Sequence, residues 1–439
     1  MKTLIGGLIA LVTLAWGLDV STAARGGSLP WIVRQEALNL SGLLAIAMMS
    51  LATFLAARPA WLERPLGGLD RMYRTHKWAG ILAVGFAVVH WATKEVAGSI
   101  LKATVGSAGK VPKEKFIGLP DVLRSLSKDM AEWGIYVLLA MLALALWKRF
   151  PYRPWRLLHQ AMPVLYLTLA FHAVMWAPTD YWMQPLGALL ALLIVAGAYG
   201  SVLALVGSIG RKRQVAGTVV AVDHPAPDVV GVRCRLEAGW RGHRPGQFAF
   251  ITFDRGEGAH PFTIASADHG DRTVDFKIKA LGDYTRGLAD RLRAGQPVKI
   301  EGPYGRFHIA RLDPRARQVW IAGGIGVTPF LAWLESLQTD AARAPAADLH
   351  YCTRDRDGDP FVARLESLCA SLPGVRLKVH GARQGEVLEA KEIVAAQEHG
   401  RRAEIWFCGP RGLAEKLKQE LRDALPGRFR FHQEAFEMR

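Results

Sequence analysis

The chain has 439 residues, of which 50% are hydrophobic and 21% charged, and its net charge is +16. This length indicates two or three domains, and the composition excludes a disordered chain, a collagen-like repeat and a coiled coil. The basic excess raises the question of a nucleic-acid partner. All four cysteines lie in the second half without a CxxC pair. That pattern gives no zinc site or disulfide framework and indicates a reducing compartment for the second half.

Apolar runs in the first 210 residues predict membrane helices. They cover residues 37–57, about 78–93, 133–147, 157–176 and 182–209, with a shorter run at 4–17. The longer runs approach the roughly 20 residues that a helix needs to cross a bilayer. The run at 4–17 follows Lys2 and precedes Ser-Thr-Ala-Ala, as in a signal peptide, but we favour a first membrane helix. We therefore expect about six helices in residues 1–210.

Basic segments predict the orientation of these helices. They follow the second helix (Arg58, Arg64, Arg71, Arg74, Lys77), precede the fifth (Lys148, Arg149, Arg153, Arg156) and follow the sixth (Arg211, Lys212, Arg213). The positive-inside rule makes these segments cytoplasmic. We expect a multi-pass protein of the cell (inner) membrane with its second half in the cytoplasm and a longer outer loop at 102–128.

The first 210 residues contain four histidines, His76, His90, His159 and His172. Two lie 14 residues apart in the third helix and two lie 13 apart in the fifth, so each pair spans about 20 Å of membrane depth. An imidazole in the membrane needs a partner, and neutral imidazole is a common heme ligand. The pattern predicts two stacked hemes, one between His76 and His159 near the cytoplasm and one between His90 and His172 near the outer face. The alternative is four separate histidines bonded to backbone or water.

The second half changes from strands to alternating strands and helices. Strands are expected at 216–223, 229–236, 247–253, 273–281 and 297–301, and then at 318–322, 348–353, 375–380, 404–408 and 428–432. Helices are expected to begin near Thr328, Phe361, Lys391 and Gly412. The first group predicts an antiparallel β-barrel and the second a parallel α/β domain. The expected domains are therefore 1–210, 211–312 and 313–439.

A glycine-rich turn follows the first strand of the α/β domain. It contains Gly323, Gly324, Gly326, Thr328 and Pro329. Glycines let backbone amides approach a pyrophosphate, and the following helix N-terminus favours its charge; Thr328 suits the cap and Pro329 the first helical position. Glycine can also serve a tight turn alone.

The second strand of the α/β domain ends at Arg354, which carries the type of side chain that favours a 2′-phosphate. We therefore prefer NADPH, with NADH as the alternative.

Further motifs occur in order along the second half. They are Arg244-Pro245-Gly246-Gln247-Phe248, His260-Pro261-Phe262-Thr263, the series Lys279, Gly282 and Thr285, the turn Gly302-Pro303-Tyr304-Gly305, and Cys408-Gly409-Pro410, with Phe436 near the C-terminus. With both histidine pairs, these motifs make the chain resemble the NADPH oxidase and ferric reductase superfamily, in particular its bacterial single-chain members. The resemblance runs from the second helix to the C-terminus.

This resemblance implies a role for each motif. The flavin motif is His260, Pro261, Phe262 and Thr263, with Thr263 beside the isoalloxazine, and Arg244, Pro245 and Gln247 precede it. Lys279, Gly282 and Thr285 lie at the flavin pyrophosphate, and Phe436 shields the flavin. Gly302 lies at the domain joint, and Gly409 and Pro410 follow Cys408, whose thiol lies near the nicotinamide. The implied cofactors are FAD, two b-type hemes and NADPH.

The same resemblance implies electron transfer from cytoplasmic NADPH to an outer acceptor. Arg34 at the outer end of the second helix is the candidate for placing oxygen, while Lys94 stands where a histidine is expected four residues after His90. Three functions stay open: an NADPH oxidase that makes superoxide, a ferric-chelate reductase, and a heme subunit that donates electrons to a protein. The expected partners are membrane lipid, NADPH and the acceptor. No nucleic acid is expected, because the basic residues serve helix orientation and anionic cofactors.

Overall fold

The computed structural model describes residues 2–22, 26–112, 114–147, 149–254, 256–341, 344–395 and 402–433. The chain divides into one compact unit that contains Met1–Ile209 and a second unit, Gly210–Glu437. The three-domain boundaries expected from the sequence stay a prediction.

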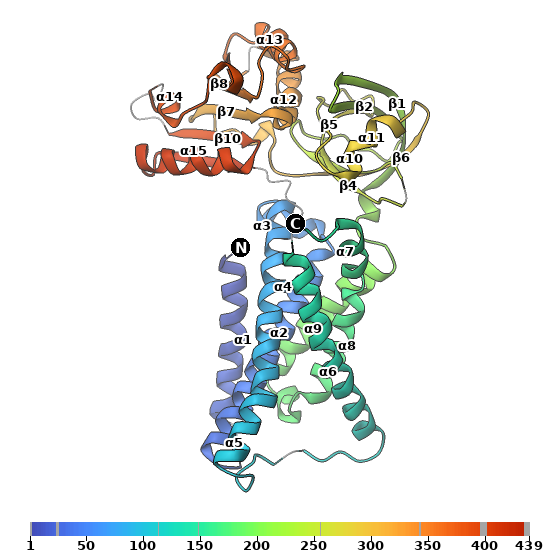
Figure 1. Ribbon diagram of the computed structural model, residues 1–439, viewed down its shortest axis with the longest axis vertical. Coiled ribbons are helices and arrows are strands. Elements are labelled where there is room, and N and C mark those ends of the chain that lie inside the picture. Colours follow the sequence, from blue (N-terminus) through green and yellow to red (C-terminus); the bar gives the residue numbers. More distant parts are fainter. Residues whose placement is uncertain are drawn as a thin grey trace. The chain divides into compact units, whose positions relative to one another are not determined.

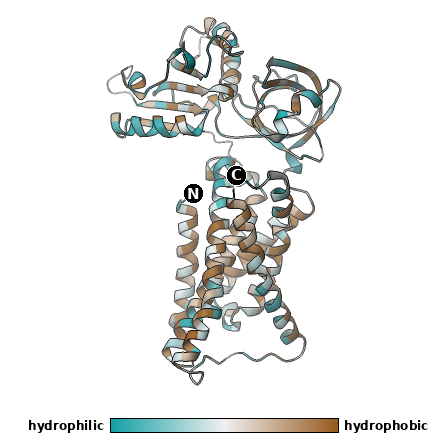
Figure 2. Cartoon of the chain, viewed as in Figure 1, coloured by the Kyte–Doolittle hydropathy of each residue, from teal (hydrophilic) through white to brown (hydrophobic). Residues whose placement is uncertain are grey.

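The first unit is a bundle of long helices (Figure 1). Its helices are α1 (Lys2–Thr22), α2 (Leu29–Ala56), α3 (Ala60–Leu66), α4 (Leu69–Ala92), the π-helix η1 (Thr93–Ala97), α5 (Gly98–Thr104), α6 (Leu119–Leu146), α7 (Tyr152–His159), α8 (Met162–Trp176), the 3₁₀ turn η2 (Thr179–Met183) and α9 (Pro185–Leu205). In the described part of the chain, six helical stretches are long and apolar enough to cross a membrane. Hydrophobic residues follow these stretches along their length (Figure 2). The expected multi-pass bundle is confirmed.

Helix α2 lies at the centre of this bundle and packs against α1, α4, α8 and α9. The approach to α9 is close, since a Cβ added at Gly200 would lie 2.4 Å from the carbonyl oxygen of Thr53. Ser50 of α2 and Tyr166 of α8 share a buried hydrogen bond of 2.9 Å. Small residues and buried hydrogen bonds of this kind hold membrane helices together, so α2 is fixed relative to its neighbours.

Two segments differ from the sequence-based expectation. Helix α6 begins at Leu119 with a proline in its first turn, 14 residues before the expected apolar run at 133–147, so the last part of the expected outer loop at 102–128 is helical. The fifth membrane stretch is broken between α7 and α8, because α7 ends at His159 and Pro163 lies in the first turn of α8. A proline lacks the amide that a continuous helix would use. The break explains why His159 and His172 are 13 residues apart and do not keep the 14-residue interval of His76 and His90 on α4.

The second unit begins with a six-stranded antiparallel sheet of order β4-β3-β6-β1-β2-β5. After the 3₁₀ turn η3 (Arg211–Arg213), its elements are β1 (Gln214–Ala226), β2 (Val229–Leu236), β3 (Phe248–Thr252), β4 (His260–Thr263), β5 (Thr273–Lys279), α10 (Asp283–Arg286), α11 (Leu288–Arg291) and β6 (Pro297–Tyr304). One bridge between Ile264 and Phe276 joins the end of β4 to β5. The sheet is therefore a partly closed barrel rather than a closed one, with an apolar interior.

A five-stranded parallel sheet of order β11-β10-β7-β8-β9 follows. Its elements are η4 (Ile309–Arg311), β7 (Arg317–Gly323), η5 (Gly324–Val327), α12 (Thr328–Gln338), β8 (Ala347–Thr353), α13 (Val362–Ala370), β9 (Val375–Gly381), η7 (Ala382–Gln384), α14 (Ala390–Ala395), β10 (Ala403–Cys408), α15 (Arg411–Ala424) and β11 (Phe429–Gln433). All five strands match the expected ones within a residue or two, because each is an apolar run between turn residues. The order reverses between β7 and β10, which is where ligands bind in open α/β sheets.

Candidate functional site

The structure brings the four membrane histidines together in the two expected pairs. The ring centroids of His76 and His159 lie 5.9 Å apart, with an angle of 87° between the ring planes. Those of His90 and His172 lie 6.5 Å apart, with an angle of 85°. The two pairs come from α4 on one side and from α7 and α8 on the other. Each pair therefore presents two imidazoles across a gap.

Both gaps fit an iron ion held by two imidazoles. A metal–imidazole bond of about 2 Å on each side, plus about 1 Å from nitrogen to ring centroid, separates two ligating rings by roughly 6 Å. The ring atom Nδ1 of His76 lies 2.8 Å from the carbonyl oxygen of Ala52, and that of His90 lies 2.9 Å from the carbonyl oxygen of Leu38. A metal-ligating histidine commonly donates its other ring N–H in this way. The bonds leave Nε2 of both α4 histidines for a metal.

These carbonyl partners repeat at the same interval as the histidines. Ala52 and Leu38 are 14 residues apart on α2, as are His76 and His90 on α4. The antiparallel packing of the two helices thus places one carbonyl beside each histidine. The sequence gives no signal for such partners, since every residue has a carbonyl.

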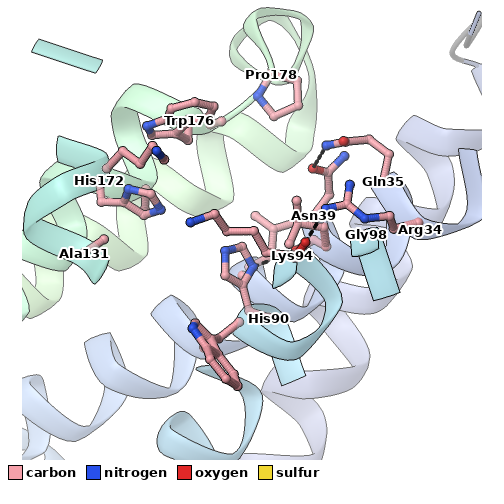
Figure 3. A pocket seen from close by; sticks show the side chains of 18 of the residues that line it. Arg34, Gln35, Asn39, His90, Lys94, Gly98, Ala131, His172, Trp176 and Pro178 are labelled. Carbon is pink, nitrogen blue, oxygen red and sulfur yellow. Dashed lines mark hydrogen bonds between the residues drawn. The ribbon is translucent and has the colours of Figure 1, made fainter. Parts of the chain in front are cut away.

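A cavity of about 1100 Å³ opens at the His90–His172 pair. His172 and Trp176 extend into it from α8, and His90 and Lys94 from α4 and η1 (Figure 3). Glycine at position 42 makes room for the imidazole, because a Cβ added at Gly42 would lie 3.0 Å from Nδ1 of His90. This volume lies slightly above the roughly 300–1,000 Å³ that is usual for cofactor and ligand pockets.

Arg34 and Lys94 meet beside this cavity, as the sequence suggested that both would lie at the outer end. The guanidinium of Arg34 donates to the carbonyl oxygen of Lys94 at 2.8 Å. A Cβ at Gly98 would lie only 2.9 Å from Arg34 Nη2, so glycine makes room for the guanidinium. The ammonium of Lys94 lies 2.5 Å from Glu132 and 3.0 Å from Glu95. Sequence reasoning missed these two acids, which offset the charge of Lys94.

The flavin motif forms β4, which lies at the edge of the antiparallel sheet. Thr263 pairs with Phe248 and is buried, while the ring of His260 stacks on Tyr284 at 4.0 Å and 11°. Burial raises the pKa of the Tyr284 phenol to about 12, so this side chain stays neutral. His260 and Tyr284 form a flat aromatic surface at the open edge of the sheet, of the kind on which a planar ring system can pack.

The expected pyrophosphate residues lie together where β5 leads into α10. The hydroxyl oxygen of Thr285 accepts hydrogen bonds from the amides of Leu281 and Gly282, each at 3.0 Å. Lys279 forms an exposed ion pair with Asp228 at 3.2 Å. The loop thus brings backbone amides, a hydroxyl and an ammonium together within the seven residues from Lys279 to Thr285.

The segment from Arg244 to Gln247 ties the two sheets of the second unit together. The side chain of Gln247 accepts from the amide of Arg244 at 2.8 Å and donates to the carbonyl of Gly305 at 3.2 Å. The carbonyl of Pro245 accepts from the indole of Trp333 on α12 at 2.9 Å. Gly246 has φ of +95°, and a Cβ there would lie 2.1 Å from the carbonyl oxygen of Phe307. A second close approach occurs at Gly302, where a Cβ would lie 3.1 Å from Ala249.

The glycine-rich turn and the Cys408 motif pack backbone against backbone. Ala322 pairs with Cys408 in the parallel ladder. A Cβ at Gly326 would lie 2.2 Å from the carbonyl oxygen of Cys408, and one at Gly323 would lie 2.6 Å from the ring of Pro410. Gly409 is the third glycine of this contact, since its Cβ would lie 3.0 Å from the backbone of Gly323. The two motifs therefore form one surface at the carboxyl edge of the sheet.

The start of α12 differs from the expected cap. Thr328 is the first helical residue rather than the cap, and its hydroxyl donates to the carbonyl of Ile325 at 3.1 Å. Pro329 follows in the first turn, where it blocks no helical hydrogen bond. The N-terminal amides of α12 are thus left without a side-chain cap, in keeping with an anion-binding helix end.

Arg354 lies exposed after β8, and a second arginine from another loop lies nearby. The guanidinium of Arg383 pairs with Asp355 at 2.8 Å, and its amide donates to the carbonyl of Arg354 at 2.9 Å. Hydrogen bonds from Gln384 and Arg383 lower the pKa of Asp355. Its charge is therefore offset, which leaves this corner of the sheet basic. Arg383 was missed because it follows a different strand.

Two of three further predicted residues lie in the part of the chain that the structure describes. Cys408 is 4% exposed at the end of β10, and Phe262 is half-buried in β4. Phe436 lies outside the described residues.

Two family models match the chain. Residues 41–170 match the ferric reductase-like transmembrane component, and residues 215–308 match an FAD-binding domain. The first match contains all of α4 and α7, and the second contains the antiparallel sheet except Gln214, the first residue of β1. The flavin-binding expectation for the barrel is thereby confirmed.

Curated relatives are reductase components of oxygenase systems. The chain is 28% identical over 217 residues to the ferredoxin–NAD(P)⁺ reductase component of the naphthalene 1,2-dioxygenase system of Pseudomonas putida, covering 47% of this chain and 63% of that protein. It is 30% identical over 152 residues to a vanillate O-demethylase oxidoreductase from a Pseudomonas strain, covering 35% and 45%. The chain thus spans about half the length of the curated relatives that it matches.

Solved structures give weaker similarities. A flavohemoglobin from Malassezia yamatoensis with bound FAD and heme has a TM-score of 0.49 at 14% identity, covering 93% of this chain and all of that one. A ferredoxin NADP⁺ reductase from Neisseria gonorrhoeae has a TM-score of 0.41 at 17% identity, covering 50% and 98%. What the family models establish is that this chain has the domain architecture of the NADPH oxidase and ferric reductase superfamily, a ferric reductase-like transmembrane component followed by an FAD-binding domain.

Proposed function

We propose that the chain is a transmembrane flavocytochrome that moves electrons from cytoplasmic NADPH to an acceptor at the outer face of the membrane. The observation that carries this proposal is the pairing of His76 with His159 and of His90 with His172 at two levels of one helical bundle. The interval of 14 residues on α4 corresponds to about 21 Å of rise. Two levels at this spacing cover most of the hydrocarbon thickness.

Each group of residues has one task in this proposal. When bound, the flavin accepts a hydride from NADPH and the two hemes carry single electrons across the membrane. The carbonyls of Ala52 and Leu38 fix the tautomers of His76 and His90 so that Nε2 faces the gap. The close approach of Gly326 to the carbonyl of Cys408 brings both motifs to one edge of the parallel sheet, where a dinucleotide would bind.

The charge distribution supports the proposed orientation. The basic segments that follow α2, precede α7 and follow α9 favour the cytoplasm. An even number of membrane helices leaves the N-terminus and the second unit on the same side. The FAD and NADPH sites would then face the cytoplasm, where NADPH is available.

Oxygen is the first candidate acceptor, with superoxide as its product. If His90 and His172 both held the outer heme, they would leave no position on its iron for oxygen, and oxygen would have to accept the electron at the heme edge. Arg34 would attract the anionic product, since its guanidinium lies at the outer cavity. A ferric chelate is the second candidate; such chelates are often anionic, and the observation that favours one is the cationic guanidinium of Arg34 beside the cavity.

The two acceptors can be separated with purified full-length protein in detergent. NADPH is added, and superoxide-dismutase-sensitive reduction of cytochrome c in air is compared with anaerobic reduction of a ferric chelate. Rapid NADPH-dependent superoxide formation supports the first candidate. Reduction of the chelate without superoxide supports the second. Activity on neither, in protein whose flavin is reduced by NADPH, would contradict both and indicate a protein acceptor.

A further inference from the structure

The paired histidines are held in two different ways. His76 and His90 each bond a carbonyl of α2 through Nδ1. Among the described residues, His159 has ring contacts with His76 and Trp155 but no side-chain hydrogen bond, and His172 hydrogen-bonds the backbone of Ser127 while its Nδ1 is buried without a partner. The second imidazole of each pair therefore lacks the α2 carbonyl that holds the first, and other contacts set its plane.

A tryptophan lies four residues from each of these two histidines. Trp155 precedes His159 by one turn of α7, and its ring stacks on the imidazole at 5.0 Å and 15°. Trp176 follows His172 by one turn of α8, and the two rings lie 6.2 Å apart at 31°. Residues four apart lie on the same helix face, so each pair meets without distortion of the helix.

Trp176 is itself anchored from a third helix. Its indole N–H donates to the carbonyl of Arg124 on α6 at 3.1 Å, and the guanidinium of Arg124 lies 4.5 Å from its ring. Figure 3 shows Trp176 beside His172 at the edge of the cavity. Arg124, Trp176 and His172 thus form a continuous contact that fixes the plane of the imidazole.

We propose that Trp155 and Trp176 are positioning residues that set the ring planes of His159 and His172. The carbonyl bonds of α2 set one plane in each pair and the tryptophan sets the other, which gives the angles of 87° and 85° between paired rings. This inference rests on the proposed function, because the angle has a chemical consequence only if both rings ligate iron. A right angle between two imidazole ligands makes low-spin ferric iron magnetically very anisotropic, whereas parallel rings do not.

The test is low-temperature electron paramagnetic resonance of the oxidised full-length protein, with a redox titration of the heme absorbance. Wild-type protein should show two highly anisotropic low-spin signals. Trp155→Leu should shift or abolish one signal and move the midpoint potential of that heme only, and Trp176→Leu should do so for the other. Trp155→Phe keeps a stacked ring and should restore the wild-type signal. Trp133→Leu is the matched control, because Trp133 on α6 is 75% exposed and touches none of the four histidines.

The outcomes separate this inference from the function on which it rests. Wild-type protein without heme would overturn the proposed function and the inference together. Two hemes whose signals and potentials are unchanged in both leucine variants would overturn the inference alone. A Trp155→Phe variant that is changed as much as Trp155→Leu would also refute it, since the stacked ring would then have no role. Loss of one heme in a leucine variant, with recovery in the phenylalanine variant, supports it.

Discussion

Replacement of Arg354 by alanine should raise the Michaelis constant for NADPH and leave that for NADH unchanged. The expected ligand group is the 2′-phosphate, which NADH lacks. Arg354 is exposed after β8, and the carboxylate next to it, Asp355, is already paired with Arg383 at 2.8 Å. The guanidinium of Arg354 is therefore available to a phosphate.

The size of the effect follows from this arrangement. A hydrogen bond to a charged group contributes about 1.5–3 kcal/mol, which corresponds to a change of about 10- to 150-fold in affinity. Solvent screens an exposed contact, so we expect the lower end, about tenfold. Arg383→Ala should have a smaller effect, because its charge is shared with Asp355.

The assay is stopped-flow reduction of the bound flavin at a series of NADPH and NADH concentrations. Arg356→Ala is the control, since Arg356 lies in the same loop but forms its ion pair with Glu386 at 3.6 Å. An equal change for both nucleotides in Arg354→Ala would refute the assigned role. So would a variant that binds NADPH as tightly as the wild type.

Three further predictions concern other parts of the molecule. Gly326→Ala should weaken NADPH binding at least about tenfold, and the variant protein should retain FAD. The new Cβ would meet the carbonyl oxygen of Cys408 at 2.2 Å and force the two motifs apart. Nucleotide titration of the flavin absorbance tests this. Burial would raise the pKa of Glu404, but hydrogen bonds, first of all from His432, hold it at about 2. Its stabilising contribution is therefore complete above pH 4.5 and lost as the pH falls towards 2, and Glu404→Gln should remove that pH dependence from urea unfolding monitored by flavin fluorescence. Arg34→Ala should slow reduction of the acceptor several-fold without changing anaerobic heme reduction by NADPH, whereas an equal loss in both steps would argue against a role at the acceptor.

Local patterns predicted most of the fold. The apolar runs located the membrane helices, and the alternation of strands and helices located the parallel sheet, because burial on one face or both leaves a direct mark on the sequence. The start of α6 at Leu119 was missed, since its first turns are polar and carry no hydrophobic run. Strand β4 was missed for a related reason: it is four residues long and contains Pro261, which is tolerated only at a sheet edge.

The site was predictable only as far as side chains carry the chemistry. The histidine spacing indicated both pairs, and the structure brings each pair to about 6 Å. The carbonyls of Ala52 and Leu38 could not be found, because a backbone group leaves no mark on the sequence. Glu132 and Arg383 belong to segments far along the chain from Lys94 and Arg354, and only the packing of those segments brings the charges together.

The central claim is that electrons from NADPH reach two bis-histidine hemes in one chain. The most direct measurement is the absorbance spectrum of the anaerobic full-length protein before and after NADPH is added, with a pyridine hemochrome assay for heme content. The account predicts about two b-type hemes per chain, both reduced by NADPH, and one heme that is still reduced by NADPH in His90→Leu. Protein that contains FAD but no heme, or an unchanged heme spectrum and content in His90→Leu, would contradict it.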